Sequence, residues 1–275
     1  MTQEAIDKVE RFVRLKPRSV QEVARLVGRN WRTAASYIDR IADERGTIAT
    51  RTFRGGTRGA LKVVYWNESD HPGGSAFQEA LLQRVQQGRD KGDFNPFDIY
   101  QYVPEKSRRA FLEEQTAYRV TEKQGLAEAL RSAEHQILIF SGDFSWALAS
   151  QGDVTLFSLL EEAVRRGVSV KVLCRVDLES VENVGRALSL NGRVKRELVE
   201  VRHAEQPLRA FVIDGKMARF KHQKDGGKKG RQFIFYEVFD EDWVEWVRQV
   251  FWNLFRKSIG AEERIRDLES IERIS

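Results

Sequence analysis

A ten-residue stretch, PLRAFVIDGK at residues 207–216, combines side chains that could act on a phosphate ester. An apolar strand ends at Asp214, a turn follows at Gly215, and the basic residues Arg209 and Lys216 flank the strand. Cationic side chains stabilise phosphoryl oxygens, and a nearby carboxylate completes the charge arrangement. The stretch therefore has the outline of a phosphodiesterase strand, and its use depends on whether a nucleophile accompanies it.

The amino-acid composition limits which other kinds of site the chain could contain. Cys174 is the single cysteine, so an intrachain disulfide and a cysteine-based zinc site are both excluded, and we expect no metal and no cofactor. No apolar run approaches the roughly 18 residues that span a bilayer. The first residues, MTQEAIDKVERF, carry early acids and lack the apolar core of a secretion signal. We expect a cytoplasmic protein without a membrane partner.

The basic residues are concentrated at the N-terminus. Residues 1–67 contain 14 Lys and Arg and 7 Asp and Glu, a balance of +7, whereas residues 68–275 have a balance of −2. This asymmetry favours a polyanion-binding N-terminal module on a nearly neutral body. A solvated basic surface without a specific partner is the alternative.

Residues 1–67 predict three helices and a hairpin. Apolar residues recur at helical spacing over 4–15, 19–28 and 30–46. Ser19 and Glu22 form the pattern of a capping box. Two alternating segments then flank a Gly-rich loop at 54–59, which is a hairpin signal.

This order of elements resembles a winged helix-turn-helix domain, and the resemblance implies binding to double-stranded DNA. The third helix would enter the major groove with its N-terminal residues at base edges, and the wing would meet phosphates or the minor groove. Trp31 has a second interpretation, as a partly buried packing residue. The predicted DNA contacts are Arg29, Asn30, Trp31, Arg32, Thr33, Ser36, Tyr37 and Arg40 on the helix and turn, and Arg51, Arg54, Arg58 and Lys62 on the wing.

Residues 68–118 are predicted to be a linker and helical connector. The polar segment 68–75 is the linker, a helix follows over 76–92, an irregular aromatic segment occupies 93–104, and 105–133 is again helical in pattern. Such helices either mediate dimerisation or pack within the chain.

Residues 119–275 alternate helices with apolar strands, which predicts an α/β sandwich with a largely parallel sheet. A last helix near residues 241–257 carries a tryptophan-rich stripe, which favours a core or an interface over a ligand cage. The fold class expected for the whole chain is therefore α/β, α+β overall.

The helix–strand alternation ending in the VID strand resembles one half of a phospholipase D-like fold. In that family the strand carries a histidine nucleophile, a lysine that holds phosphate oxygens and a supporting aspartate. Asp214 falls on the aspartate position, Arg209 on the lysine position, and Pro207 on the histidine position, where it cannot act as a nucleophile.

His222, His203 and His71 do not supply the missing nucleophile of this motif. His222 starts an HQK triplet in a polar Gly- and Lys-rich segment, and no acid stands at the required spacing after it. His203 also lacks the pattern, and His71 lies in the linker. The family needs two such motifs, and the chain has one half. We therefore expect no catalytic residues and no enzyme.

A winged helix, a helical connector and a phospholipase D-like domain without its histidine resemble, in that order, the TrmB family of transcriptional regulators, which are mostly archaeal. The resemblance implies a homodimer that binds promoter DNA in the nucleoid and responds to a small-molecule effector. Several members sense sugars, but those carry a further β-rich piece, and this chain is short for them.

The sequence thus predicts a sequence-specific DNA-binding transcriptional regulator with a non-catalytic sensing or dimerisation domain. Three alternatives remain: a sequence-tolerant chromatin-type protein, a phospholipase D-type phosphodiesterase or nuclease, and a protein-interaction adaptor.

Overall fold

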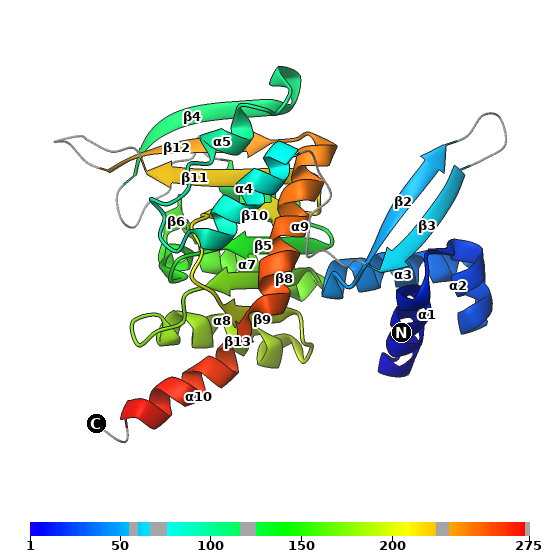
Figure 1. Ribbon diagram of the computed structural model, residues 1–275. Coiled ribbons are helices and arrows are strands. Elements are labelled where there is room, and N and C mark those ends of the chain that lie inside the picture. The colour runs from blue at the N-terminus through cyan, green and yellow to red at the C-terminus, as the bar shows by residue number, and fades with distance from the viewer. Residues whose placement is uncertain (55–59, 67–75, 116–124, 224–230, 273–275) are drawn as a thin grey trace. The chain divides into compact units, whose positions relative to one another are not determined.

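The chain forms two compact units, Met1–Asp70 and His71–Ser275, and each has hydrophobic clusters of its own (Figure 1). The computed structural model describes five segments of the chain, residues 1–54, 60–66, 76–115, 125–223 and 231–272.

The first unit is three helices beside a small antiparallel sheet with strand order β1-β3-β2. Its elements are α1 (Gln3–Leu15), β1 (Arg18–Ser19), α2 (Val20–Val27), α3 (Trp31–Arg45), β2 (Ile48–Arg54) and β3 (Ala60–Trp66). Val9, Val23, Ile38 and Val64 are fully buried where the helices meet the sheet. The predicted winged helix-turn-helix is confirmed.

The second unit is built on an eight-stranded sheet of order β13-β9-β8-β5-β10-β11-β12-β4. Its strands are β4 (Arg108–Gln115), β5 (Gln136–Phe140), β8 (Ser169–Cys174), β9 (Val199–His203), β10 (Ala210–Ile213), β11 (Met217–Gln223), β12 (Arg231–Val238) and β13 (Ile259–Gly260). A separate two-stranded sheet pairs β6 (Ser150–Gln151) with β7 (Val154–Thr155).

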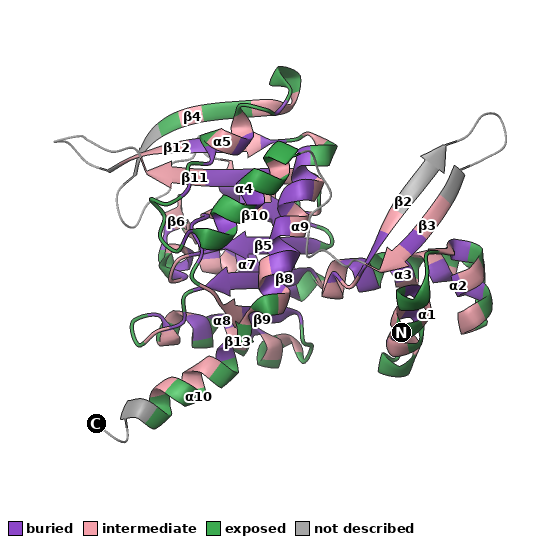
Figure 2. Ribbon diagram, in the orientation of Figure 1, coloured by how far each residue is buried: buried purple, intermediate pink, exposed green. Residues whose placement is uncertain are grey.

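Helices cover both faces of this sheet. They are α4 (Ala76–Gln87), α5 (Phe97–Tyr100), α6 (Leu126–Arg131), α7 (Leu156–Arg166), α8 (Val181–Val194), α9 (Glu241–Lys257) and α10 (Ala261–Glu272). Along β5, Ile137 and Ile139 join the cluster formed with α6, α7 and α8, while Leu138 and Phe140 join the cluster formed with α4, α5 and α9. The central strands are therefore buried on both sides (Figure 2). The predicted α/β class is confirmed.

The tryptophan-rich stripe of α9 belongs to the core. Trp243, Trp246 and Trp252 are buried, and Phe251 meets Phe140 of β5 edge to face at 5.2 Å between ring centroids. The prediction of core or interface packing for this helix is confirmed.

The expectation of a largely parallel sheet is wrong. In the described part of the eight-stranded sheet, only the pairings of β8 with β5 and with β9 are parallel, and the other five are antiparallel. Asp214 and Gly215 both have positive φ, 50° and 64°, and the Lys216 N–H donates to the Ile213 carbonyl at 2.9 Å. This tight turn makes β10 and β11 a hairpin, which is antiparallel by construction.

The prediction of a helix over residues 105–133 is also wrong in its first part. Residues 108–115 form strand β4, which pairs with β12 along its whole length, with Phe111 stacked on Phe235 at 5.4 Å. In the described part of this range, Glu105–Ser107 form a short 3-10 helix and α6 is the α-helix. Because β4, α4 and α5 belong to the sheet and its covering layer, the described part of residues 68–118 is no separate connector. The predicted linker 68–75 lies outside the described residues.

Candidate nucleic-acid interface

The helix-turn-helix is fixed by hydrogen bonds at each helix end. Glu22 N–H donates to the Ser19 hydroxyl at 3.2 Å, and Ser19 N–H donates back to the Glu22 carboxylate at 2.8 Å. The pKa of Glu22 is lowered by this Ser19 N–H and then by the Ser19 hydroxyl, which donates to the same carboxylate at 2.9 Å. Gly28 ends α2 in the left-handed region with φ 63°, and Asn30 begins α3 by accepting the Thr33 N–H at 2.9 Å. The turn therefore sets the direction in which α3 leaves α2.

The exposed face of α3 carries most of the predicted DNA contacts. Arg32, Ser36 and Arg40 are exposed and four residues apart, so they form one stripe. Trp31 is 59% exposed, with the Arg32 guanidinium 5.6 Å from its ring centroid. The alternative of Trp31 as a partly buried packing residue is therefore wrong.

The other predicted contacts near this helix differ in how accessible they are. Arg29 is exposed in the turn, whereas Thr33 and Tyr37 are half-buried. The side-chain oxygen of Asn30 is occupied by the cap, and Arg40 donates to Glu44 at 2.7 Å.

The wing is a hairpin whose strands pair from Ile48 with Trp66 to Arg54 with Ala60. The backbone places Arg51 and Arg54 on β2, while Arg58 lies outside the described residues. The ammonium of Lys62 pairs with Asp39 of α3 at 2.6 Å, and its predicted contact with DNA stays a prediction. Lys62 thus ties the wing to α3 in this structure.

The three residues of the degenerate motif perform three different tasks. Pro207 is buried. A Cβ added to Gly88 would lie 2.7 Å from the Pro207 Cγ, so the turn after α4 packs closely against the Pro207 ring. Asp214 accepts the backbone N–H groups of Glu134, His135 and Gln136, each at 2.8 Å.

Arg209 is the member of this motif that lines a cavity. Its Nη1 donates to the carbonyls of Gln206 and Leu208, at 3.0 and 2.7 Å. Burial lowers the pKa of Arg209, and the charge of Asp143 acts in the opposite direction.

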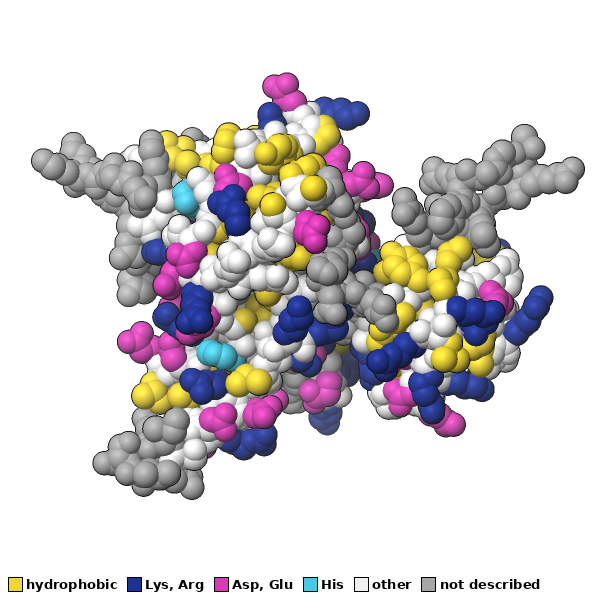
Figure 3. Space-filling model, viewed as in Figure 1, with side chains coloured by type: hydrophobic (Ala, Val, Ile, Leu, Met, Phe, Trp, Pro, Cys, Tyr) yellow, Lys and Arg dark blue, Asp and Glu magenta, His cyan; other side chains and the backbone are white. Residues whose placement is uncertain are grey.

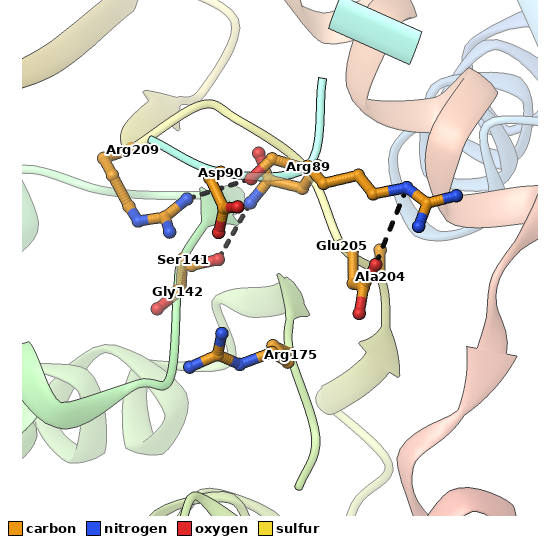
Figure 4. Close-up of a pocket in the computed structure, with 9 residues that line it drawn as sticks. Arg89, Asp90, Ser141, Gly142, Arg175, Ala204, Glu205 and Arg209 are labelled. Atoms are coloured by element: carbon orange, nitrogen blue, oxygen red, sulfur yellow. Dashed lines mark hydrogen bonds and ion pairs between the residues drawn. The ribbon is translucent and has the colours of Figure 1, made fainter. Parts of the chain in front are cut away.

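The cavity beside Arg209 has a volume of about 300 Å³ (Figure 4). Its lining comprises Arg89, Asp90, Ser141, Gly142, Arg175, Ala204, Glu205, Gln206 and Arg209. A second cavity of about 450 Å³ shares Asp90, Gly142, Arg175 and Arg209 with it. No histidine is among the described residues that line either cavity.

His203, His222 and Cys174 all lie on strands of the eight-stranded sheet. His203 accepts the Val176 N–H on Nδ1 at 2.9 Å, and burial, followed by the charge of Arg264, lowers its pKa. His222 lies on β11 opposite Ile234 in the pairing with β12. Burial raises the pKa of the Cys174 thiol to about 12.

No protein-family model matches the sequence, and no curated protein sequence matches it either. Solved structures with a similar arrangement include TrmBL2, an archaeal chromatin protein that binds DNA, at 14% identity and TM-score 0.42 over 94% of both chains. Nuc from Salmonella typhimurium, a phospholipase D family member, shares 11% identity at TM-score 0.40 over 56% of this chain and 97% of its own.

NucT from Helicobacter pylori shares 14% identity at TM-score 0.38, over 56% of this chain and 99% of its own. Because every TM-score is below 0.5 and every identity below 15%, these likenesses assign no activity to this chain.

The sequence analysis did not identify two groups of residues that contribute to these sites. Asp39 supplies the partner of Lys62, and Gly142 and Arg175 line the cavity. A signal for the cavity was present, because SGD and RVD directly follow two buried apolar strands, and carboxyl ends of neighbouring parallel strands meet at one edge.

Two other kinds of site were sought in the described part of the chain. It contains no helix long and apolar enough to cross a membrane, and no group of three or more His, Cys, Asp and Glu side chains suited to a metal ion.

Proposed function

We propose that this protein is a DNA-binding transcriptional regulator of the TrmB-like type. Its winged-helix unit would contact promoter DNA, and its second unit would be a non-catalytic phospholipase D-like domain that supports a homodimer. The observation that carries the proposal is the exposed stripe of Arg32, Ser36 and Arg40 on a helix that follows a capped turn. A recognition helix presents its N-terminal residues to base edges in the major groove in this way.

Charge supports the same assignment. The balance of +7 over residues 1–67 would attract the phosphate backbone and bring the recognition helix to the groove. Figure 3 shows Lys and Arg side chains gathered on the visible face of the first unit. Such a protein would associate with the nucleoid.

Position 207 supports the proposal of a non-catalytic second unit. Pro207 offers no nucleophile, and the Asp214 carboxylate is engaged by three backbone N–H groups of the strand start. Turnover of a phosphodiester that is lost in a His222→Ala variant would contradict this part of the proposal.

The test is fluorescence anisotropy of the full chain on two duplexes at several salt concentrations. One duplex is the region upstream of its own gene and the other a shuffled sequence. A regulator whose operator lies there should prefer the first by roughly 10³-fold or more at physiological salt. Equal and steeply salt-dependent binding to both would identify a sequence-tolerant DNA-coating protein, and binding to neither would favour a protein-interaction module.

Two variants test the interface at residue level. Arg32→Ala should lower affinity for the preferred duplex by about 1–3 kcal/mol if Arg32 contacts a base, with less effect on the shuffled one. Arg54→Ala should lower affinity on both duplexes alike. Arg186→Ala is the control, because Arg186 is an exposed arginine of the second unit paired with Glu182. Parental binding by both test variants would contradict the assignment.

A further inference from the structure

Strand β4 forms one edge of the eight-stranded sheet, and among the described residues its only strand neighbour is β12. A strand at a sheet edge presents unpaired backbone N–H and C=O groups along its outer side, and these can pair with a strand of another chain. We propose that this edge is a dimer interface, in which β4 of one copy pairs antiparallel with β4 of a second copy. The pairing would join the second units of two chains, so it rests on the homodimer of the proposed function.

The order of charges along β4 is self-complementary. Its sequence, RRAFLEEQ, begins with Arg108 and Arg109, and Glu113 and Glu114 follow after three uncharged residues. Two such strands can run antiparallel about a two-fold axis at Phe111. Arg109 of each copy then stands opposite Glu113 of the other copy. Arg108 stands opposite Glu114 in the same way.

These facing charges favour a second copy as the partner and select one register. Opposite charges at facing positions stabilise a strand pair, and like charges destabilise it. A shift of the two strands by one residue leaves one of the two arginines opposite a neutral residue, and a shift by two aligns neither arginine with a glutamate. The register centred on Phe111 also keeps the equivalent faces of the two sheets on the same side, as a two-fold axis requires.

Pairing with β12 does not use this complementarity. Arg109 stands opposite Glu237 of β12, but Glu237 pairs with the buried Arg219 at 3.4 Å, and Arg109 is exposed. Glu113 stands opposite Phe233, which is uncharged. The outer edge of β4 is therefore where an arginine and a glutamate can face each other.

Apolar side chains are exposed beside the same edge. Leu112 of β4 is 52% exposed, and Phe97 of α5 is 44% exposed. The Phe97 ring lies 6.2 Å from that of Tyr236, which stands opposite Ala110. Because Ala110 and Leu112 are two residues apart on one strand, both lie on the face of the sheet that carries α5.

The exposed apolar surface continues beyond α5. Tyr102 is 51% exposed, and its ring lies 4.8 Å from that of Phe77, which is 41% exposed. Figure 3 shows hydrophobic side chains on the visible face over α4 and α5. Exposed apolar surface of this kind is typical of interaction sites, and a second copy seated on the β4 edge would remove part of it from water.

Sedimentation velocity of the full chain over a range of concentrations tests the pairing. The parent should be a dimer. Arg109→Glu and Glu113→Arg should each weaken dimerisation by about 10-fold or more, because two facing pairs in every dimer then carry like charges. Arg109 is changed rather than Arg108, since Arg108 donates to the carbonyls of Tyr100 and Gln101 within its own chain.

An equimolar mixture of the two variants separates a loss of pairing from a loss of folding. A mixed pair again places an arginine opposite a glutamate at both positions, so the mixture should form dimers at concentrations where each variant alone is a monomer. Arg186→Glu on α8, an exposed site beside Glu182, is the control and should dimerise like the parent. Urea unfolding of each variant confirms that it is folded.

The possible failures are distinguishable. A parent that sediments as a monomer at every concentration would contradict both the β4 pairing and the homodimer. A dimer that both variants leave intact, or a mixture that stays monomeric, would overturn the β4 pairing alone and place the homodimer on another surface. DNA binding is measured separately by anisotropy, so neither result decides whether the winged helix contacts DNA.

Discussion

Asp214 has the residue type of a catalytic carboxylate and the contacts of a structural one. Its two oxygens accept three successive N–H groups at the start of β5, and its φ of 50° places it in the left-handed region of a tight turn. Asp and Asn tolerate that region better than most residues. The carboxylate therefore joins the β10–β11 hairpin to the central strand.

Asp214→Ala should lower the free energy of unfolding by about 2–4 kcal/mol, because three hydrogen bonds to a charged acceptor are lost, one of them from the buried Gln136. Asp214→Asn should cost less, since it retains one acceptor and tolerates positive φ. Urea unfolding measures both. Asp153→Ala, at an exposed position, is the control and should be within about 0.5 kcal/mol of the parent. An Asp214→Ala loss as small as the control's would contradict this role.

His203 makes stability depend on pH in a defined direction. Its pKa in the folded chain lies below the ordinary value of 6.5, because burial and then Arg264 disfavour the imidazolium. The unfolded chain binds the proton more readily, so this contribution is complete above about pH 6.5 and is lost as pH falls toward the lowered folded pKa. Protonation would also remove the acceptor for Val176.

The measurement is the free energy of unfolding between pH 7.5 and 5 for the parent and for His203→Asn, whose side-chain oxygen can still accept that N–H. We expect the variant to lose less stability than the parent across this interval. Parallel pH profiles would show that His203 does not contribute.

The sequence indicates the roles of some single residues but not the contacts of others. The sequence indicated that position 207 lacks a nucleophile and that Arg209 is the cation of the motif. It did not indicate that Arg209 would lie beside Arg175, because that meeting depends on the parallel pairing of β5 with β8. Nor did it indicate that Lys62 pairs with Asp39, because the two residues are 23 positions apart along the chain.

At the scale of elements, local signals decided most of the first unit. Caps, periodicity and a glycine at φ 63° specify α2, the turn and α3 within one short segment. β4 was missed because Ala110, Leu112 and its acidic residues favour a helix, while its partner strand lies more than 100 residues later. The Asp214–Gly215 pair is a hairpin signal. A hairpin at this position predicts an antiparallel strand pair and therefore a mixed sheet.

The turn after α4 packs closely on the start of the β10 strand. Gly88→Ala should lower the free energy of unfolding by about 1–3 kcal/mol, because the new methyl would meet the rigid Pro207 ring at 2.7 Å. Gly92→Ala is a matched control four residues later, since nothing lies within 4 Å of its added Cβ. Chemical denaturation compares the two, and equal stabilities would show that α4 does not hold this contact.

At the scale of the whole molecule, the charge and the cavity are divided between the two units. The first holds the basic excess and its own small core, and the second holds the sheet and the cavity. A unit of 70 residues buries less surface for its size than one of 205, so we expect it to unfold first.

Duplex DNA should separate the two transitions. In calorimetric unfolding of the full chain, DNA should raise the lower-temperature transition and leave the higher one unchanged, because a ligand stabilises only the folded unit that binds it. Inorganic sulfate at matched ionic strength is the control for non-specific salt effects. A single transition raised by DNA would contradict independent units.

The contact between Gly88 and Pro207 also bears on how freely this fold can change its chemistry over evolutionary time. We expect a histidine at 207 to compete for space with the turn after α4, because a Cβ added at Gly88 would already lie 2.7 Å from the Pro207 ring. A substitution that introduced a nucleophile there would then lose packing before it gained activity, so the contact would oppose such a change.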